Sequence, residues 1–227
     1  MDNMISKLTT LIFIPISLML IYVAGSWGLA DVYYRPALNE IRSWIFGKNE
    51  INDERWEKLK LNLSKAQQLD PSNPYIYENL AIALEGRFAK VKSGNSNAEA
   101  YRQEALAHYL TSASLRPTWP YVWNSIMTVK YRLGEIDDEF FTAFKNAERL
   151  GRWEPDIQRM LVDIGLINWL KFPASERKYL LDIVSRSIEK QPVKTMEIVN
   201  KNGLLDVICL LNKDKEDVNK YCNQYKI

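Results

Sequence analysis

The N-terminal segment contains no charged residue from Leu8 to Ala30, in the sequence LTTLIFIPISLMLIYVAGSWGLA. As an α-helix it would extend over roughly 34 Å, which is enough to cross a hydrocarbon core of about 30 Å. Pro15 is compatible with a membrane helix. Three aromatic residues lie at or just after its C-terminal end, where an interfacial belt would fall: Trp27, Tyr33 and Tyr34. The sequence therefore predicts that residues 1–30 form a short tail and a transmembrane signal anchor.

A cleaved signal peptide is the alternative, because Gly28 and Ala30 occupy positions typical of a cleavage site before Asp31. The apolar run is, however, longer than the about 7–15 residues of a signal-peptide core, and Lys7 is the only basic side chain before it. We therefore expect an uncleaved anchor, and cleavage after Ala30 stays open.

The charges on the two sides of this segment nearly balance, so the positive-inside rule does not set its orientation. A short tail followed by a large C-terminal domain is typical of a signal anchor that exports the domain. We therefore expect a single-pass protein of the inner membrane, held through residues 8–30, with its helical domain in the periplasm.

The composition indicates an all-α chain without a nucleic-acid partner. Lys and Arg number 30 against 28 Asp and Glu, and no basic block stands out. The chain has 9 Gly, 9 Pro and no long alternation of apolar and polar residues.

Three helix starts resemble one another: PSNPYIYENLAIAL, PTWPYVWNSIMTVK and RWEPDIQRMLVDIGL. Their opening prolines, Pro74, Pro120 and Pro155, are 46 and 35 residues apart. The second spacing is close to the period of about 34 residues of tetratricopeptide (TPR) repeats, and a polar loop at 89–100 accounts for the longer first one. We therefore expect residues 51–173 to form a TPR-like right-handed stack of antiparallel helix hairpins.

Helices are also expected on both sides of these repeats. Residues 31–50 include an amphipathic juxtamembrane helix that ends at Gly47, and residues 174–227 are expected to form capping helices. The apolar face of the juxtamembrane helix consists of Ala37, Leu38, Ile41, Trp44 and Ile45.

Cys209 and Cys222 form neither a CxxC nor a metal-binding pattern. We expect two separate thiols on neighbouring helices. A disulfide is the alternative, which an outward-facing domain would permit.

No catalytic or metal-binding set emerges from the sequence, so we expect no enzymatic activity, no cofactor and no metal. His108 is the only histidine, and no cysteine lies near it. The acidic run 135–139 falls where a hairpin turns into its second helix, where carboxylates cap free N–H groups and favour the helix dipole.

The first helices of TPR-like hairpins line a concave face, so their inner positions form a candidate groove for an extended peptide or a glycan. The alternative is an ordinary solvated helix face. The groove residues are Tyr75, Glu78, Ile82, Glu85, Tyr121, Asn124, Thr128, Tyr131, Asp156, Arg159 and Asp163. Trp119 joins them as a candidate stacking platform, although it precedes Pro120 at an N-cap position, where packing between hairpins is the expected role.

Three phrases together resemble the VpsP family of bacterial polysaccharide-biosynthesis proteins: ADVYYRPALNEI, SLRPTWPYVWNSI, and AERLGRWEPDIQ leading to DIGLINWLKF. The resemblance covers roughly residues 22–173. It implies a role in making or exporting a bacterial cell-surface exopolysaccharide. We therefore expect a membrane-anchored scaffold or adaptor for the membrane proteins of that assembly. A glycan-binding module of the same machinery and a TPR adaptor in another envelope pathway are the alternatives. The resemblance implies no catalytic residue.

Overall fold

The computed structural model describes residues 2–47, 52–88, 96–213 and 216–225. Within these residues every element is helical and no strand occurs, which confirms the all-α prediction. The chain divides into two compact units, unit 1 (Met1–Leu115) and unit 2 (Arg116–Ile227).

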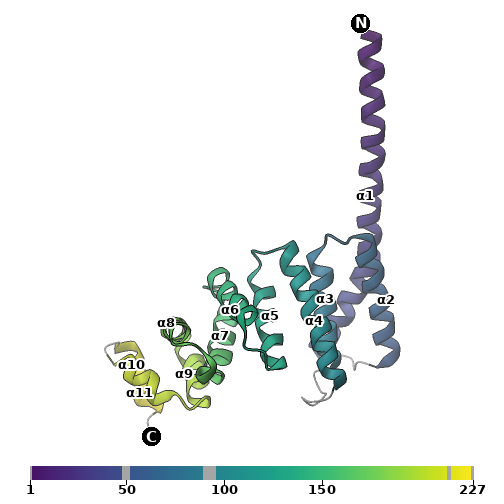
Figure 1. The fold of residues 1–227 in the computed structure, drawn as a ribbon. Helices are drawn as coiled ribbons and strands as arrows, with labels where there is room; N and C mark the ends of the chain where they lie inside the picture. Colours follow the sequence, from purple (N-terminus) through teal and green to yellow (C-terminus); the bar gives the residue numbers. More distant parts are fainter. Residues whose placement is uncertain (1, 48–51, 89–95, 214–215, 226–227) are drawn as a thin grey trace. The chain divides into compact units, whose positions relative to one another are not determined.

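Unit 1 contains two helix pairs (Figure 1). Its helices are α1 (Asp2–Ile45), α2 (Asp53–Leu69), α3 (Pro74–Phe88) and α4 (Ser96–Leu115). α1 packs against α2 and α3 against α4, while α3 also contacts both helices of the first pair. Small and large apolar residues fill the core between them, including Leu63, Ala66, Ile76, Ala81 and Tyr109. The predicted loop 89–100 extends too far, because α4 already begins at Ser96; residues 89–95 lie outside the described part of the chain.

The two halves of α1 differ in their surroundings: the N-terminal half is exposed and the C-terminal half is packed against other helices. Its N-terminal half stands clear of α2–α4 in Figure 1, and residues 11–22 are all exposed. Its C-terminal half packs into unit 1, where Ala30, Ala37 and Ile41 are buried. In the described residues, α1 is the one helix long and apolar enough to cross a membrane.

The predicted juxtamembrane helix is therefore the second half of α1 and not a separate element. The helix runs through residue 30 without a break, and Ser26 Oγ donates a hydrogen bond to the carbonyl of Leu69 at the end of α2. It ends at Ile45, and Gly47 follows with φ +65°, as the sequence predicted. Ile45 itself is 64% exposed, so it does not belong to the buried face.

Unit 2 begins with three helices whose starts are marked in the sequence by Pro120, the N-cap Asp137 and Pro155. They are α5 (Pro120–Leu133), α6 (Asp138–Leu150) and α7 (Pro155–Ile167). The short 3₁₀ helix η1 (Trp169–Lys171) leads to α8 (Ala174–Lys190), α9 (Pro192–Lys201), α10 (Leu205–Leu211) and α11 (Glu216–Tyr225). α5 pairs with α6, and α7 packs against α5, α6, α8 and α9. Buried Phe172 meets both Phe140 and Phe144 edge to face in the core of this unit.

The two cysteines form a disulfide, so the expectation of separate thiols was wrong. Cys209 on α10 and Cys222 on α11 are both buried, and their Cα atoms are 5.8 Å apart, a distance typical of a bridge. The sequence did not predict this bond, because the two cysteines are 13 residues apart. They meet only because the short helices α10 and α11 pack against each other.

Candidate binding surfaces

The groove residues of unit 1 lie on α3 and are partly engaged within the fold. Tyr75 is 49% exposed, while Glu78 and Ile82 are half-buried. Glu85 accepts a hydrogen bond from the hydroxyl of the buried Tyr109 on α4, at 2.8 Å. Glu85 therefore ties α3 to α4.

The groove residues of unit 2 come together on α5 and α7, which pack against each other. Tyr121 donates a hydrogen bond of 2.8 Å to Glu154, and this carboxylate raises the pKa of the tyrosine. Asp156 pairs with Arg159 on the next turn, and Arg159 also contacts Gln191 at the end of α8.

The remaining groove residues of unit 2 face the surface only in part. Asn124, Thr128 and Tyr131 are half-buried on α5, and Thr128 bonds to its own helix through the carbonyl of Asn124. Asp163 on α7 accepts hydrogen bonds from Lys201 and Asn202. A single groove that continues from unit 1 into unit 2 stays a prediction.

Trp119 is the N-cap residue of α5, with extended backbone angles (φ −87°, ψ 109°) and no side-chain cap. Its half-buried indole lies 5.3 Å from the ring of Tyr121, and the guanidinium of Arg116 lies 4.2 Å from the indole centroid. Glu154 precedes Pro155 of α7 in the same way and also forms no side-chain cap. Proline at the first helical position removes one of the N–H groups that a capping side chain would otherwise satisfy.

The acidic run 135–139 caps a helix, as predicted, and also surrounds a lysine that the sequence analysis missed. Asp137 accepts the backbone N–H of Phe140 at 3.0 Å and is the N-cap of α6. The side chain of Lys130 is 5% exposed, and its Nζ lies 2.7 Å from both Glu135 and Asp137 and 3.2 Å from Glu139. The sequence feature that could have revealed this site is a lysine inside the largely apolar stretch IMTVKY, followed closely by acidic residues.

Electrostatics couples Lys130 to this cap. Burial alone would lower the pKa of Lys130, but hydrogen bonds to Asp137, Glu135 and Glu139 outweigh it and raise the pKa. Burial alone would raise the pKa of the Asp137 carboxyl, but the lysine and the backbone N–H of Phe140 lower it. Both charged forms are therefore stabilised by folding.

Substituting Asp137→Asn is expected to lower the free energy of unfolding by about 1 kcal/mol at pH 7, because asparagine keeps the cap but loses the ion pair. The value is small because the Asp137 side chain is 51% exposed. Since the folded pKa is lowered, this stability is present above the unfolded pKa of about 3.9 and is lost as pH falls through the folded pKa. Urea unfolding of the wild type and Asp137→Asn from pH 7 to pH 2 should show that the difference in their free energies of unfolding vanishes in acid. Asp138→Asn, next to it but outside the ion pair, is the control; an Asp137 difference that persists at pH 2 would contradict the linkage.

His108 lies half-buried on α4, with its ring 6.3 Å from that of Tyr77. Burial lowers the pKa of the imidazole, and the nearby Glu104 opposes this only in part. In the part of the chain that the structure describes, no group of three His, Cys, Asp or Glu residues is placed to hold a metal ion.

Sequence reasoning also missed the buried carboxylate of Glu148 on α6. Its side chain is 6% exposed and accepts hydrogen bonds from Arg186 and from the hydroxyl of Tyr179, both on α8. Arg152 lies 4.0 Å away. Burial and the Glu148 carboxylate raise the pKa of Tyr179. No local pattern marks Glu148, because its partners follow 31 and 38 residues later.

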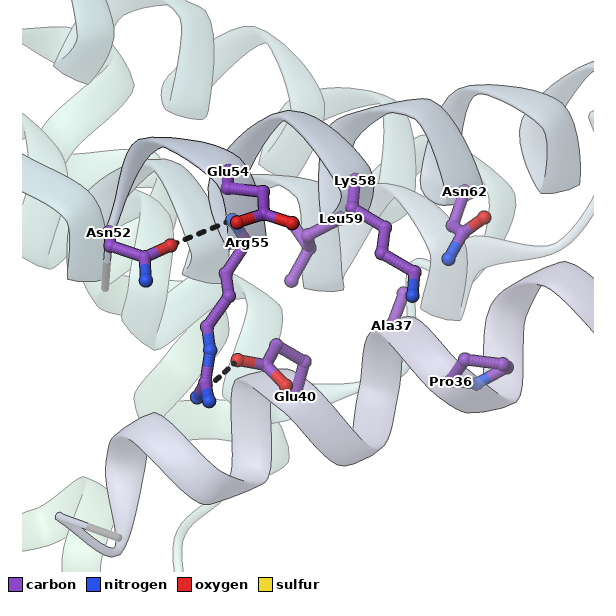
Figure 2. A pocket seen from close by; sticks show the side chains of 9 residues that line it. All are labelled: Pro36, Ala37, Glu40, Asn52, Glu54, Arg55, Lys58, Leu59 and Asn62. Atoms are coloured by element: carbon purple, nitrogen blue, oxygen red, sulfur yellow. Dashed lines mark hydrogen bonds and ion pairs between the residues drawn. The ribbon is translucent and has the colours of Figure 1, made fainter. Parts of the chain in front are cut away.

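A cavity of about 540 Å³ lies between α1 and α2 and contains none of the predicted groove residues (Figure 2). Buried Ala37 and Leu59 line it together with charged side chains. Arg55 reaches Glu40 across the cavity at 3.4 Å, and Lys58 also projects into it (Figure 2). Acidic and basic groups balance here, so the cavity indicates no particular class of ligand.

Comparison with known proteins adds no assignment to these surfaces. No protein-family model matches the chain, and no curated protein matches it. A function for this chain is therefore argued from its own residues and their arrangement.

Proposed function

We propose that this chain is a single-pass protein of the bacterial inner membrane that presents a TPR-like helical domain in the periplasm. There it acts as an adaptor for membrane proteins that assemble or export a cell-surface polysaccharide. The observation that carries the proposal is the continuity of α1, which joins an exposed apolar stretch to a buried packing face without a hinge. An adaptor built in this way holds its binding surfaces near the membrane and raises their effective concentration for membrane partners.

The hydrogen bond between Ser26 and the end of α2 supports a membrane boundary near Ser26. Residues 2–25 precede the hydrogen bond from Ser26 to Leu69, and as a helix they extend over roughly 36 Å. That length crosses a hydrocarbon core of about 30 Å and places Trp27 at the interface. The α2–α3 turn would then face the headgroups.

The disulfide supports the outward orientation of the domain. Bridges persist in oxidising compartments such as the periplasm and are rare in the cytoplasm. Cys209 and Cys222 are both bonded, so the C-terminal helices fit a protein that folds after export. The polysaccharide pathway itself rests on the resemblance of three short phrases to the VpsP family.

Reporter fusions after residue 227 test the topology. We expect an alkaline phosphatase fusion to be active, a cytoplasmic fluorescent reporter to stay dark, and the protein to resist carbonate extraction. Ile14→Lys with Leu18→Lys should abolish membrane retention, because each charge at the helix centre costs about 2.5–3.5 kcal/mol. Both side chains are exposed on α1, and Leu61→Lys, at an exposed position on α2, is the matched control.

Co-purification tests the adaptor role. Full-length protein extracted in mild detergent should retain a polymerase or export component of the polysaccharide machinery.

The two experiments have separate contradicting outcomes. An inactive phosphatase fusion would overturn the periplasmic placement. A correctly oriented protein that retains no such component would overturn the adaptor role and leave the topology intact.

A further inference from the structure

A cleft of about 250 Å³ lies in unit 2 between the α6–α7 turn and the C-terminal end of α8. Arg152, Trp153 and Pro155 line one wall, and Arg186 and Lys190 line the other. None of these residues belongs to the predicted groove. The cleft is smaller than most small-molecule sites, which measure about 300–1,000 Å³, so its size suits a single ring.

Trp153 gives the cleft an aromatic surface. Its side chain is 69% exposed, although tryptophan normally buries most of its large apolar surface. The guanidinium of Arg152 lies 6.0 Å from the ring, and Lys190 Nζ lies 5.7 Å from it. An exposed indole flanked by two cations therefore combines a face for ring stacking with donors for an anion.

The charge of the lining is one-sided. Arg152, Arg186 and Lys190 all line the cleft, whereas no carboxylate does. Glu148 is nearby, but its side chain is only 6% exposed and it pairs with Arg186. The acidic residues that follow in the chain are also engaged, since Glu154 accepts the Tyr121 hydroxyl and Asp156 pairs with Arg159.

The uncharged polar groups of the lining are satisfied inside the fold. Gln158 and Gln191 donate to the carbonyls of Gly151 and Pro155, each at 3.2 Å, and Ser187 Oγ bonds to Thr195 Oγ1 at 2.8 Å. In contrast, Nε of Arg186 is buried without a hydrogen-bond partner in the described residues. The hydrogen-bond donors of the lining that are left for a ligand therefore belong to cationic side chains, and such donors prefer carboxylate or phosphate oxygens.

We propose that this cleft binds a six-membered sugar ring that carries a carboxylate, as in a uronate unit of an acidic glycan. The apolar face of the ring would stack on Trp153, and the carboxylate would accept hydrogen bonds from Arg152 and Lys190. The rings of Trp153 and Pro155 give the lining an apolar wall, which suits a rigid ring better than a flexible acidic side chain. The site does not depend on the proposed adaptor role or on the membrane orientation.

Calorimetric titration of the full chain in phosphatidylcholine nanodiscs with trigalacturonate tests the site. We expect binding that weakens as salt is raised, and no binding of neutral maltotriose over the same concentrations. Trp153→Ala should weaken the binding about tenfold, and Lys190→Gln about fivefold. Lys178→Gln, an exposed lysine near the other end of α8, should leave the affinity unchanged.

Three results would overturn the proposal. One is the absence of trigalacturonate binding to a folded wild-type protein. Another is equal affinity for maltotriose, which would remove the role of the carboxylate. The third is triglutamate binding that equals trigalacturonate binding and is lost in Trp153→Ala, which would assign the cleft to acidic peptides. Thermal melts by circular dichroism separate these results from misfolding, and Trp153 is exposed enough for its replacement to be tolerated.

Discussion

Replacing Glu148 with alanine is expected to lower the free energy of unfolding of unit 2 by about 3–5 kcal/mol. The substitution leaves the guanidinium of Arg186 and the hydroxyl of Tyr179 without their shared acceptor. The Arg186 side chain is itself only 15% exposed, so water cannot fully replace the carboxylate. Urea unfolding followed by circular dichroism should show an earlier transition in unit 2 and little change in unit 1.

Two further variants show whether charge or shape causes the loss. Glu148→Gln keeps a hydrogen-bond acceptor without the charge, so an intermediate loss is expected. The pair Glu148→Leu with Arg186→Met removes both charges together and should recover much of the stability, as apolar replacements of buried ion pairs often do. Glu197→Ala, at an exposed position on α9, is the control. A Glu148→Ala loss below about 1 kcal/mol would show that the carboxylate is not needed to hold α6 against α8.

Removing the disulfide is expected to destabilise the C-terminal helices by about 3 kcal/mol, because the bridge closes a loop of 13 residues in the unfolded chain. The double variant Cys209→Ala with Cys222→Ala keeps small apolar groups at both buried positions. Hydrogen exchange should accelerate in α10 and α11 first, since their packing against α8 and α9 is then the main restraint.

The effect of reduction distinguishes the bridge from packing. Dithiothreitol should accelerate exchange in the wild-type protein to the level of the double variant and leave the double variant unchanged. Equal exchange in α10 and α11 with and without the bridge would contradict a stabilising role for it. Alkylation of the cysteines in untreated cells should likewise fail, because a bonded cysteine offers no thiolate.

Local chemistry explains which elements could be predicted. Pro74, Pro120 and Pro155 each open a helix, because a proline loses nothing at a position where the N–H is free in any case. Asp137 caps α6 for a similarly local reason, since its acceptor lies three residues from the N–H it satisfies. The uncharged run after Lys7 likewise predicted that the first half of α1 is a long apolar helix.

Longer-range features could not be predicted from such signals. The amphipathic pattern after residue 30 correctly indicated a helix but not its continuity with the apolar N-terminal segment. The predicted groove residues were chosen by repeat position, but in the structure Glu85 bonds to Tyr109 and Asp156 pairs with Arg159. The cleft beside Trp153 was not found, because α6–α7 and the end of α8 are distant in sequence.

The sequence by itself determined the helical class, the apolar N-terminal helix and most helix starts, because these depend on periodicity and on residues within one turn. Only the tertiary structure decided that Cys209 bonds to Cys222 and that Glu148 neutralises Arg186. It also decided that Lys130 sits at the centre of its acidic cap. The physical reason is that burial and charge pairing depend on which helix faces meet, and no residue spacing along a single helix specifies that meeting.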